Sequence, residues 1–544
     1  MIFKNLLSYI IKFFFFFKLN IHRIYLNSNI YNKKISKVSK KNLEYKPSQI
    51  LLDCIIKYEK KKIKIEEFSL NLIWNNKNLK EKDYKKLHSF FWLFSLDLKS
   101  SKKTTRETIL SWIDSNSKYQ SNSWDIDILS KRVIAWISSS KLTYEDGDEI
   151  YKRKFNDIIQ KQINHLINEI ERSEWVDDKM IGCSAIILAG LSYKDETKYL
   201  SFGFNLLKKI NKFSFDDYGF PKSRNIRQLY FYLKYYVLIR EWLKESQTEI
   251  PEYIDESIYY LGQAYSLVWQ KLKQNILFNG NHDSTNDDFD KYLERLGYKF
   301  KNENNESGGY VILKNKKISL IMDVGQNPEK KFSNNYQAGA LSFEILSGNE
   351  KLISNSGYFQ NYKSKLNDVS KSTAAHSTLI IDSSSSCKWK KEINERSKVE
   401  NGLKILKKSI IFEKNYWSIN SAHDGYNKKY GIIHDRQIEF YPEHSKFVGN
   451  DKLIIKKKIE SINFEIRFHF KPTIKLMKTQ DGKSILIELS KEGWKFTCDN
   501  HKLDIENGLY FGKKNSYMEN KNIFISGMTQ NENQTIKWEL IKIS

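Results

Sequence analysis

The pattern of apolar and polar positions changes once along the chain, near residue 300. Over residues 47–297 the apolar residues recur at helical spacing. The segment 149–171 shows this spacing most clearly. Its residues Phe155, Ile159 and Ile163 fall on one face, among Lys, Gln, Asn and Glu on the others. The first half of the chain is therefore predicted to be helical.

The helical half contains a series of such segments, separated by short polar links. We expect helices at 50–60, 84–97, 104–114, 124–141, 149–171, 177–191, 198–211, 227–243, 253–272 and 286–296. Segment 177–191 is apolar almost all round and should be buried. Antiparallel helical hairpins of this kind fit a bundle, a solenoid or a closed α/α toroid, and the periodicity does not choose among the three.

After Glu303 apolar and polar residues alternate, and tight turns separate short runs. Residues 309–324 are predicted to form two strands around the turn Lys314–Lys317. Leu341 and Phe343 lie on one face of a further strand. Additional strands are expected at 377–382, 404–413, 416–423, 436–441, 452–458, 464–469, 484–489 and 523–527. This succession of short strands predicts an antiparallel β-sandwich.

The length of the chain, 544 residues, is too great for one hydrophobic core. We predict an apolar and basic N-terminal segment at 1–45, a helical domain at 46–300 and a β-sandwich domain at 301–544. The link between the second and third parts should lie near Lys299–Ser307, a polar stretch rich in Asn and Glu.

Residues 1–26 combine an apolar run with flanking basic residues, Lys4, Lys18 and Arg23. The run is shorter than the about 20 residues that a spanning helix needs. It also lacks the small-residue cleavage site of a secretory signal. Peripheral contact of this segment with an anionic membrane is one interpretation. A buried or frayed N-terminal helix is the other.

Charge and cysteine content narrow the choice of partner. The formal net charge of +25 suits a polyanion, which could be nucleic acid, an anionic membrane or an acidic glycan. An abundance of Lys, Asn and Ile also accounts for this charge without any functional meaning. No nucleic-acid-binding module is recognisable, so nucleic acid is not predicted as a partner. The cysteines are far apart and form no C-x-x-C pair, which argues against a disulfide framework or a cysteine-built zinc site.

Several short motifs that follow one another along the chain carry a resemblance to a known family. They are DDYGFPKSRN from Asp216, FNGNHD from Phe278, GGYVILKNKKISLIMDVG from Gly308, NNYQAGALSFEI from Asn334, KLISNSGYF from Lys351, STAAHSTLIID from Ser372, SAHDGYNKKYGIIHDRQIEF from Ser421 and RFHFKP from Arg467. Together they resemble the heparinase II/III-like polysaccharide lyases. The resemblance implies an α/α toroid followed by an antiparallel β-sandwich, in agreement with the pattern of apolar positions.

The family resemblance also implies a chemistry. Lyases of this family cleave uronate-containing polysaccharides by β-elimination, in which a base removes the proton next to the carboxylate and an acid protonates the departing oxygen. We therefore expect a lyase acting on an acidic polysaccharide, located in the cell envelope or periplasm, with the cytoplasm as the alternative. A catalytically degenerate protein that binds acidic glycans without cleaving them is the second hypothesis. The oligomeric state is not indicated.

Two residues are the predicted acid–base groups. His376 lies in STAAHST, where the resemblance implies an imidazole of the active site or of a former metal site. The alternative is a buried histidine satisfied by the backbone. Tyr218 lies in the turn of DDYGFP, where a phenol can act as acid or base. The tyrosines that follow, at positions 230, 232, 235 and 236, are expected mainly in the helix core.

Four residues are predicted to bind the substrate. Arg224 and Asn225 precede a helix, and a guanidinium beside a helix N-terminus makes a good carboxylate site. Asn225 could instead only cap that helix. His434 and Arg436 share a strand face and could bind an anionic sugar, with a surface ion pair to Asp435 or Glu439 as the alternative. We expect His376, Arg224 and Tyr218 to converge on one cleft.

The resemblance also bears on metal binding. Gln337 and Asn355 stand at positions where the family carries metal ligands, and only His376 matches the expected ligand type. Neutral amides bind zinc poorly compared with imidazole or carboxylate. We therefore predict that the protein holds no metal and needs no cofactor.

Overall fold

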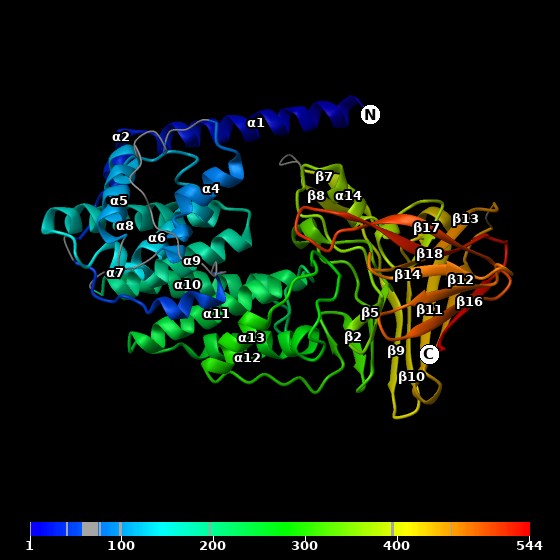
Figure 1. The fold of residues 1–544 in the computed structure, drawn as a ribbon. Helices are drawn as coiled ribbons and strands as arrows, with labels where there is room; N and C mark the ends of the chain where they lie inside the picture. The colour runs from blue at the N-terminus through cyan, green and yellow to red at the C-terminus, as the bar shows by residue number, and fades with distance from the viewer. Residues whose placement is uncertain are drawn as a thin grey trace. The chain divides into compact units, whose positions relative to one another are not determined.

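The computed structural model describes residues 2–39, 42–56, 74, 78–96, 101–194, 197–392, 396–458 and 460–543. The chain divides into two compact units. The first contains Met1–Ser214 and Phe231–Tyr259, and the second contains Phe215–Tyr230 and Tyr260–Ser544. Helices come first along the chain and strands follow (Figure 1). The domain limits at residues 45 and 300 stay predictions.

The first unit is helical. Its helices are α1 (Ile2–Leu26), α2 (Asn29–Ile35), α4 (Glu81–Ser89), α5 (Lys102–Asn116), α6 (Ile126–Ser138), α7 (Ser140–Thr143), α8 (Glu149–Glu169), α9 (Val176–Ser192), α10 (Thr197–Ser214) and most of α11 (Ile226–Glu245) and α12 (Glu252–Tyr265). Helix α9 is buried from Met180 to Ser192, as its apolar sequence predicted, and it packs against α6, α8 and α10. No helix in the described part of the chain has the length and apolar character to cross a membrane.

Several predicted helices differ from the observed elements; the segment 124–141, for example, divides at Ser139 into α6 and α7. The segment 84–97 is broken at Phe90, whose φ of +56° ends α4 before a 3₁₀ helix, Phe91–Ser95, and residue 97 lies outside the described part. In 50–60, the described residues form a 3₁₀ helix, Gln49–Cys54, and residues 57–60 lie outside the described part. The segment 253–272 is an α-helix only to Tyr265 and continues as a π-helical turn, Ser266–Gln270.

The second unit is built on antiparallel sheets. A five-stranded sheet holds β1 (Glu306–Ser307), β2 (Tyr310–Lys314), β3 (Ile318–Asp323), β4 (Phe343–Ser347) and β5 (Glu350–Ile353). An eight-stranded sheet holds, in spatial order, β14 (Lys475–Lys478), β15 (Ser484–Glu488), β16 (Gly493–Cys498), β19 (Gln534–Lys542), β12 (Lys446–Ile455), β11 (Ile432–Tyr441), β10 (Trp417–His423) and β9 (Ile405–Phe412). A four-stranded sheet holds β17 (Lys502–Tyr510), β18 (Met518–Met528), β13 (Asn463–His469) and β6 (Leu379–Ile381), and β7 (Lys388–Lys391) pairs with β8 (Ser397–Asn401). The second unit also contains helices α13 (Asp287–Arg295), α14 (Lys365–Lys371) and α15 (Asn427–Tyr430).

The three larger sheets share one apolar core, which explains why they fold as one unit. Phe343 of β4 stacks on Trp538 of β19 with ring centroids 5.5 Å apart. Phe468 of β13 meets the same tryptophan at 5.1 Å. Each of these aromatic side chains alternates with polar neighbours along its strand, so the pleat directs all three inward. The predicted antiparallel β architecture is confirmed.

Candidate functional site

A tight turn after α10 displays Tyr218 to solvent. The carboxylate of Asp216 accepts hydrogen bonds from the backbone N–H groups of Tyr218 (3.0 Å) and Phe220 (2.8 Å). Gly219 has a φ of +75°, a conformation that glycine adopts without strain. Tyr218 is consequently 79% exposed. Burial raises the pKa of the Asp216 carboxyl above its ordinary value, although both backbone bonds oppose that shift.

Arg224 ends the same segment and is held by the backbone of the turn between β1 and β2 and of the loop after β3. Its Nε donates to Gly308 O (2.8 Å), its Nη1 to Gly325 O (3.1 Å) and Gln326 O (3.2 Å), and its Nη2 to Gly309 O (3.3 Å). Nη2 also donates to Asp323 Oδ1 at 2.5 Å. No N–H group of the guanidinium is left over.

The glycines around Arg224 make this arrangement possible. A Cβ atom on Gly325 would lie 2.4 Å from Arg224 Cζ, and one on Gly309 would lie 2.9 Å from Nη2. The guanidinium also lies over the ring of Tyr310, whose hydroxyl donates back to Arg224 O at 2.7 Å. Burial opposes the positive charge, but Asp323 and Tyr310 hold the pKa of Arg224 above its ordinary value. Arg224 therefore fastens the turn that carries Tyr218, and its predicted role in binding a carboxylate stays a prediction.

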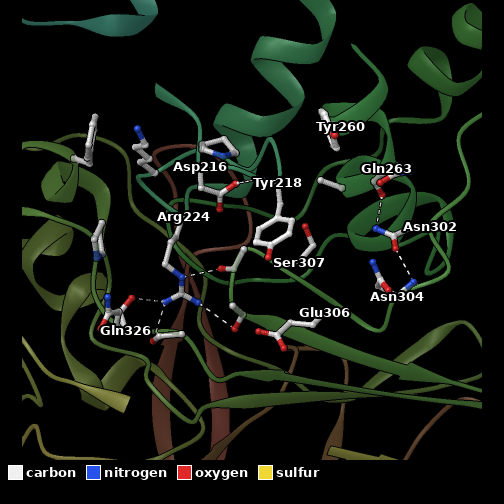
Figure 2. A pocket seen from close by; sticks show the side chains of 18 of the residues that line it. Asp216, Tyr218, Arg224, Tyr260, Gln263, Asn302, Asn304, Glu306, Ser307 and Gln326 are labelled. Atoms are coloured by element: carbon white, nitrogen blue, oxygen red, sulfur yellow. Dashed lines mark hydrogen bonds between the residues drawn. The ribbon is translucent and has the colours of Figure 1, made fainter. Parts of the chain in front are cut away.

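A pocket of about 830 Å³ opens beside this turn, and all of its lining residues belong to the second unit. Tyr218 and Arg224 both line it, and Figure 2 shows the Tyr218 ring extending into the hollow. The other side chains that line the pocket include aromatic rings, amides and charges: Asp216, Lys222, Tyr260, Gln263, Asn302, Asn304, Asn305, Glu306, Gln326, Asn327, Glu329, Phe332 and Lys408. Aromatic surface with a few convergent polar groups is typical of small-ligand sites.

The amide side of this pocket comes from the stretch that was expected to be a linker. Asn302 Nδ2 donates to Gln263 O (3.1 Å), and its Oδ1 accepts from Asn304 N (2.8 Å). Lys408 of β9 forms an ion pair with Glu306 at 2.8 Å. The density of Asn residues immediately before the Gly308–Gly309 pair is the sequence signal for this side of the pocket. It is an ambiguous signal, because such residues also occur in ordinary loops.

Asn225 acts as a helix cap. Its Oδ1 accepts from the backbone N–H groups of Arg227 (3.0 Å) and Gln228 (3.2 Å) at the start of α11. The residue is buried, and it does not line the pocket. The capping alternative therefore describes its observed contacts. A role in substrate binding remains a prediction.

His376 is buried outside the pocket, so the expected convergence holds for Tyr218 and Arg224 but not for this residue. Only 1% of His376 is exposed, and its Nδ1 lies 2.9 Å from Ser372 O. Its Nε2 has no hydrogen-bond partner among the described residues. Burial lowers the pKa of His376 to about 4, so the imidazole is neutral near pH 7. Its role in catalysis stays a prediction.

The side chains at the family's metal positions do not fit a metal. The amide of Gln337 donates to Gly357 O (3.0 Å) and accepts from Gly280 N (3.0 Å). Asn355 Oδ1 accepts from Ser377 N (2.9 Å). Both amides therefore form hydrogen bonds with backbone groups. Of the three positions 337, 355 and 376, only 376 carries an imidazole. Within the described residues no group of three or more His, Cys, Asp or Glu side chains is arranged to hold a metal ion.

His434 and Arg436 lie in a buried ion network rather than at a surface. His434 Nε2 lies 2.7 Å from Asp451 Oδ1, and Arg436 Nε donates to the same oxygen at 2.7 Å. Trp538 Nε1 donates to Asp451 Oδ2 at 3.0 Å. They share a strand face as predicted, but the expected alternative of a surface pair with Asp435 or Glu439 is wrong. The acidic partner of both is Asp451, which lies directly opposite Arg436 on β12. Neither residue lines the pocket, and their substrate-binding role stays a prediction.

The fold resembles solved structures of polysaccharide lyases. The structure titled Heparinase III has a TM-score of 0.68 and 14% sequence identity, over 97% of this chain and 91% of that chain. The heparan sulfate lyase HepC from Pedobacter heparinus has a TM-score of 0.62 and 13% identity, over 87% of this chain and 78% of that one. At this identity the likeness shows the fold, and it confirms the predicted class, an α/α toroid followed by an antiparallel β-sandwich.

Sequence comparison finds a family of this class in the C-terminal part of the chain. No curated protein sequence matches the chain. Residues 302–539 match the family model described as heparinase II/III-like, C-terminal. The C-terminal part of the chain therefore matches the heparinase II/III-like family, the family that its motifs resemble.

Proposed function

We propose that this protein is a lyase that cleaves an acidic, uronate-containing polysaccharide by β-elimination, with the pocket beside Tyr218 as the sugar-binding site. One observation carries the proposal. Most of the pocket wall, from Asn302 to Ile410, is built by the domain that matches the heparinase II/III-like family. The heparan sulfate lyase of the same fold acts on an acidic polysaccharide, as its name says.

The chemistry assigns roles to the residues that line the pocket. A base removes the proton next to the uronate carboxylate, the bond to the glycosidic oxygen breaks, and an acid returns a proton to that oxygen. A carbon–carbon double bond remains in the product, and no water is consumed. Tyr218 is the acid–base group in this proposal, because its phenol extends into the pocket from a fixed turn.

The carboxylate needs hydrogen-bond donors or a cation while negative charge builds up on it. The side-chain amides of Asn302, Asn304 and Gln326 are among the donors that line the pocket. Arg224 acts as a positioning residue, since its guanidinium holds the Tyr218 turn against the sheet. The basic character of the chain would aid capture of the polyanion in a salt-dependent way.

A second candidate function is binding of an acidic polysaccharide without cleavage. The observation that favours it is the lining of the pocket, which contains no histidine among the described residues. His376, the one imidazole that the family resemblance supplied as an acid–base group, lies buried outside it. In this case Tyr218 and the amides would hold the sugar, and no proton transfer would follow.

The experiment that separates the two functions uses the purified full chain and a panel of uronate polymers, among them heparan sulfate, hyaluronan, alginate and polygalacturonate. Cleavage creates a double bond conjugated to the carboxylate, so a lyase produces a rise in ultraviolet absorbance. Saturable binding of a polymer without that rise would establish the second function. Neither binding nor cleavage across the panel would refute both.

We also propose that the protein works in the cell envelope, where acidic polysaccharides are encountered. Fractionation of cells that produce the full chain, followed by immunodetection, tests this location. Recovery of the chain only in the cytoplasmic fraction would refute it.

A further inference from the structure

Helix α1 is fastened to the helical unit along one face. His22 Nε2 lies 2.6 Å from Glu169 Oε2 at the end of α8. One turn further, Leu26 is buried. The following helix α2 continues the attachment, because the Tyr31 hydroxyl lies 2.7 Å from His165 Nδ1 in the interior of the unit. The carboxyl-terminal part of α1 therefore has a defined orientation relative to α8.

The opposite face of α1 presents large apolar side chains to solvent. Phe13 is 67% exposed, Phe17 54% and Ile24 71%. Their spacing places all three on one stripe of the helix, on the side away from His22 and Leu26. The rings of Phe13 and Phe17 stack with centroids 6.2 Å apart, which makes the stripe continuous. Phe14 and Ile21 border it and are also exposed.

A stripe of this kind is uncommon on a soluble surface. Single exposed apolar residues are ordinary, but several phenylalanine and isoleucine side chains aligned on one helix mark a contact with a membrane or another protein. Lys18 and Arg23 stand on the flanks of the stripe, so the helix is apolar on one face and basic beside it. Helices that lie in the interface of a bilayer have this arrangement.

The charge of residues 1–43 favours an anionic membrane over a second copy of the chain as the partner of this stripe. Residues 1–43 contain no Asp or Glu. Their basic residues are Lys4, Lys12, Lys18, Arg23, Lys33, Lys34, Lys37, Lys40 and Lys41. A second copy of the chain would bring the same positive segment against itself, and like charges would oppose that pairing. Anionic lipid headgroups complement the segment and attract each Lys or Arg close to the surface.

We propose that helix α1 docks the protein on an anionic membrane surface, with Phe13, Phe17 and Ile24 entering the apolar part of the interface and the flanking basic residues contacting lipid headgroups. This inference stands independently of the proposed lyase activity, because it involves a different unit and no residue of the pocket. It would place a polysaccharide-handling domain beside a membrane.

The test measures co-sedimentation of the full chain with vesicles of phosphatidylcholine alone and with vesicles that also contain phosphatidylserine. The variant Phe13→Ser/Phe17→Ser/Ile24→Ser keeps the net charge and removes the stripe. We expect it to reduce the fraction bound to anionic vesicles by about tenfold or more. Added salt should weaken the binding of the wild type.

The matched control is Ile150→Ser/Val369→Ser/Met477→Ser, which removes exposed apolar residues elsewhere and should bind as the wild type does. Equal binding by the α1 variant, or equal binding of the wild type to neutral vesicles, would overturn the proposal. Self-association of the wild type that the α1 variant abolishes, without vesicle binding, would assign the stripe to a second copy and overturn it as well. Circular dichroism checks that both variants are folded.

Discussion

The pocket beside Tyr218 and the network around Asp451 contain polar side chains of the kinds found at active sites, but their surroundings are opposite. Tyr218 is 79% exposed and faces the hollow. His434 and Arg436 are fully buried: both contact Asp451, and Arg436 also donates to Leu341 O and Ser377 O. Both regions lie in motifs that resemble the same family. The motifs thus identify polar residues of two kinds. Solvent access distinguishes the residues that can contact a substrate from those that stabilise the fold.

Arg224 shows both properties at once. It lines the pocket, yet its guanidinium is occupied by Asp323 and by backbone carbonyls of the neighbouring sheet. A position in the pocket wall is therefore not enough for a side chain to bind a ligand. The side chain must also have hydrogen-bond donors that the protein does not already use.

The largest expected effect is on the buried network. Arg436→Leu leaves the Asp451 carboxylate buried with His434 and Trp538 as its remaining partners. Breaking a buried ion pair in this way costs about 3–5 kcal/mol. Urea unfolding, followed by circular dichroism, should show a loss of that size. The exposed pair Lys301–Glu303 is the control, and Lys301→Ala should leave the midpoint of the urea transition unchanged. Equal small losses in both variants would contradict the structural role of Arg436.

A smaller loss is expected at Arg224. Arg224→Lys keeps the charge but cannot reproduce the planar fork that reaches Gly308, Gly325 and Asp323 together. We expect destabilisation of about 2–4 kcal/mol and weaker polysaccharide binding, because the Tyr218 turn loses its attachment. Unfolding curves and binding isotherms of the same preparation measure both. Weaker binding with unchanged stability would instead make Arg224 a direct ligand of the carboxylate.

The buried histidines predict a dependence of stability on pH. Burial lowers the pKa of His376 to about 4 and that of His469 to about 3, from an ordinary value of 6.5. At pH values between the folded-state pKa and 6.5, the unfolded chain binds more protons than the folded chain. The free energy of unfolding therefore falls as the pH decreases from about 6.5 to about 4. Each histidine should contribute on the order of 1–3 kcal/mol to that loss.

Unfolding measured at a series of pH values tests this prediction, with His376→Gln as the comparison. The variant should show a shallower decline over the same range, because one titrating group is gone. An identical slope would mean that His376 is not buried in a neutral form.

The smallest effect on stability is expected at Tyr218. Tyr218→Phe removes only a hydroxyl from an exposed side chain, so the free energy of unfolding should change by less than about 0.5 kcal/mol. Thermal or urea unfolding measures it. A large loss would show that Tyr218 supports the fold and would weaken its assignment to the pocket.

The sequence predicted the fold well where periodicity is local. The hairpin of β2 and β3, buried α9 and the core tyrosines of α11 all follow from spacing within one segment. Strand β19 was missed although Ile536, Trp538 and Leu540 alternate, since Lys and Glu between them also occur in surface loops. The break at Phe90 depends on a left-handed backbone conformation that a phenylalanine rarely adopts.

The contacts of the candidate residues were less predictable, because they depend on pairing between distant segments. Asp451 becomes the partner of Arg436 only through the register of β11 and β12. Arg224 is occupied only because glycines at 309 and 325 let its guanidinium approach the backbone of another element. The motifs identified Arg224 and Arg436 as candidates. Only the tertiary structure showed that their guanidinium groups are occupied by protein atoms.

Above all, we propose that the pocket beside Tyr218 cleaves an acidic polysaccharide. The most direct measurement is the initial rate of unsaturated product formation from the best uronate polymer, for the wild type and for folded Tyr218→Phe. We predict cleavage by the wild type and a rate lower by about 10²–10⁴-fold in the variant, as expected for an acid–base group. An unchanged rate in the variant, or no product from the wild type with any uronate polymer, would contradict it.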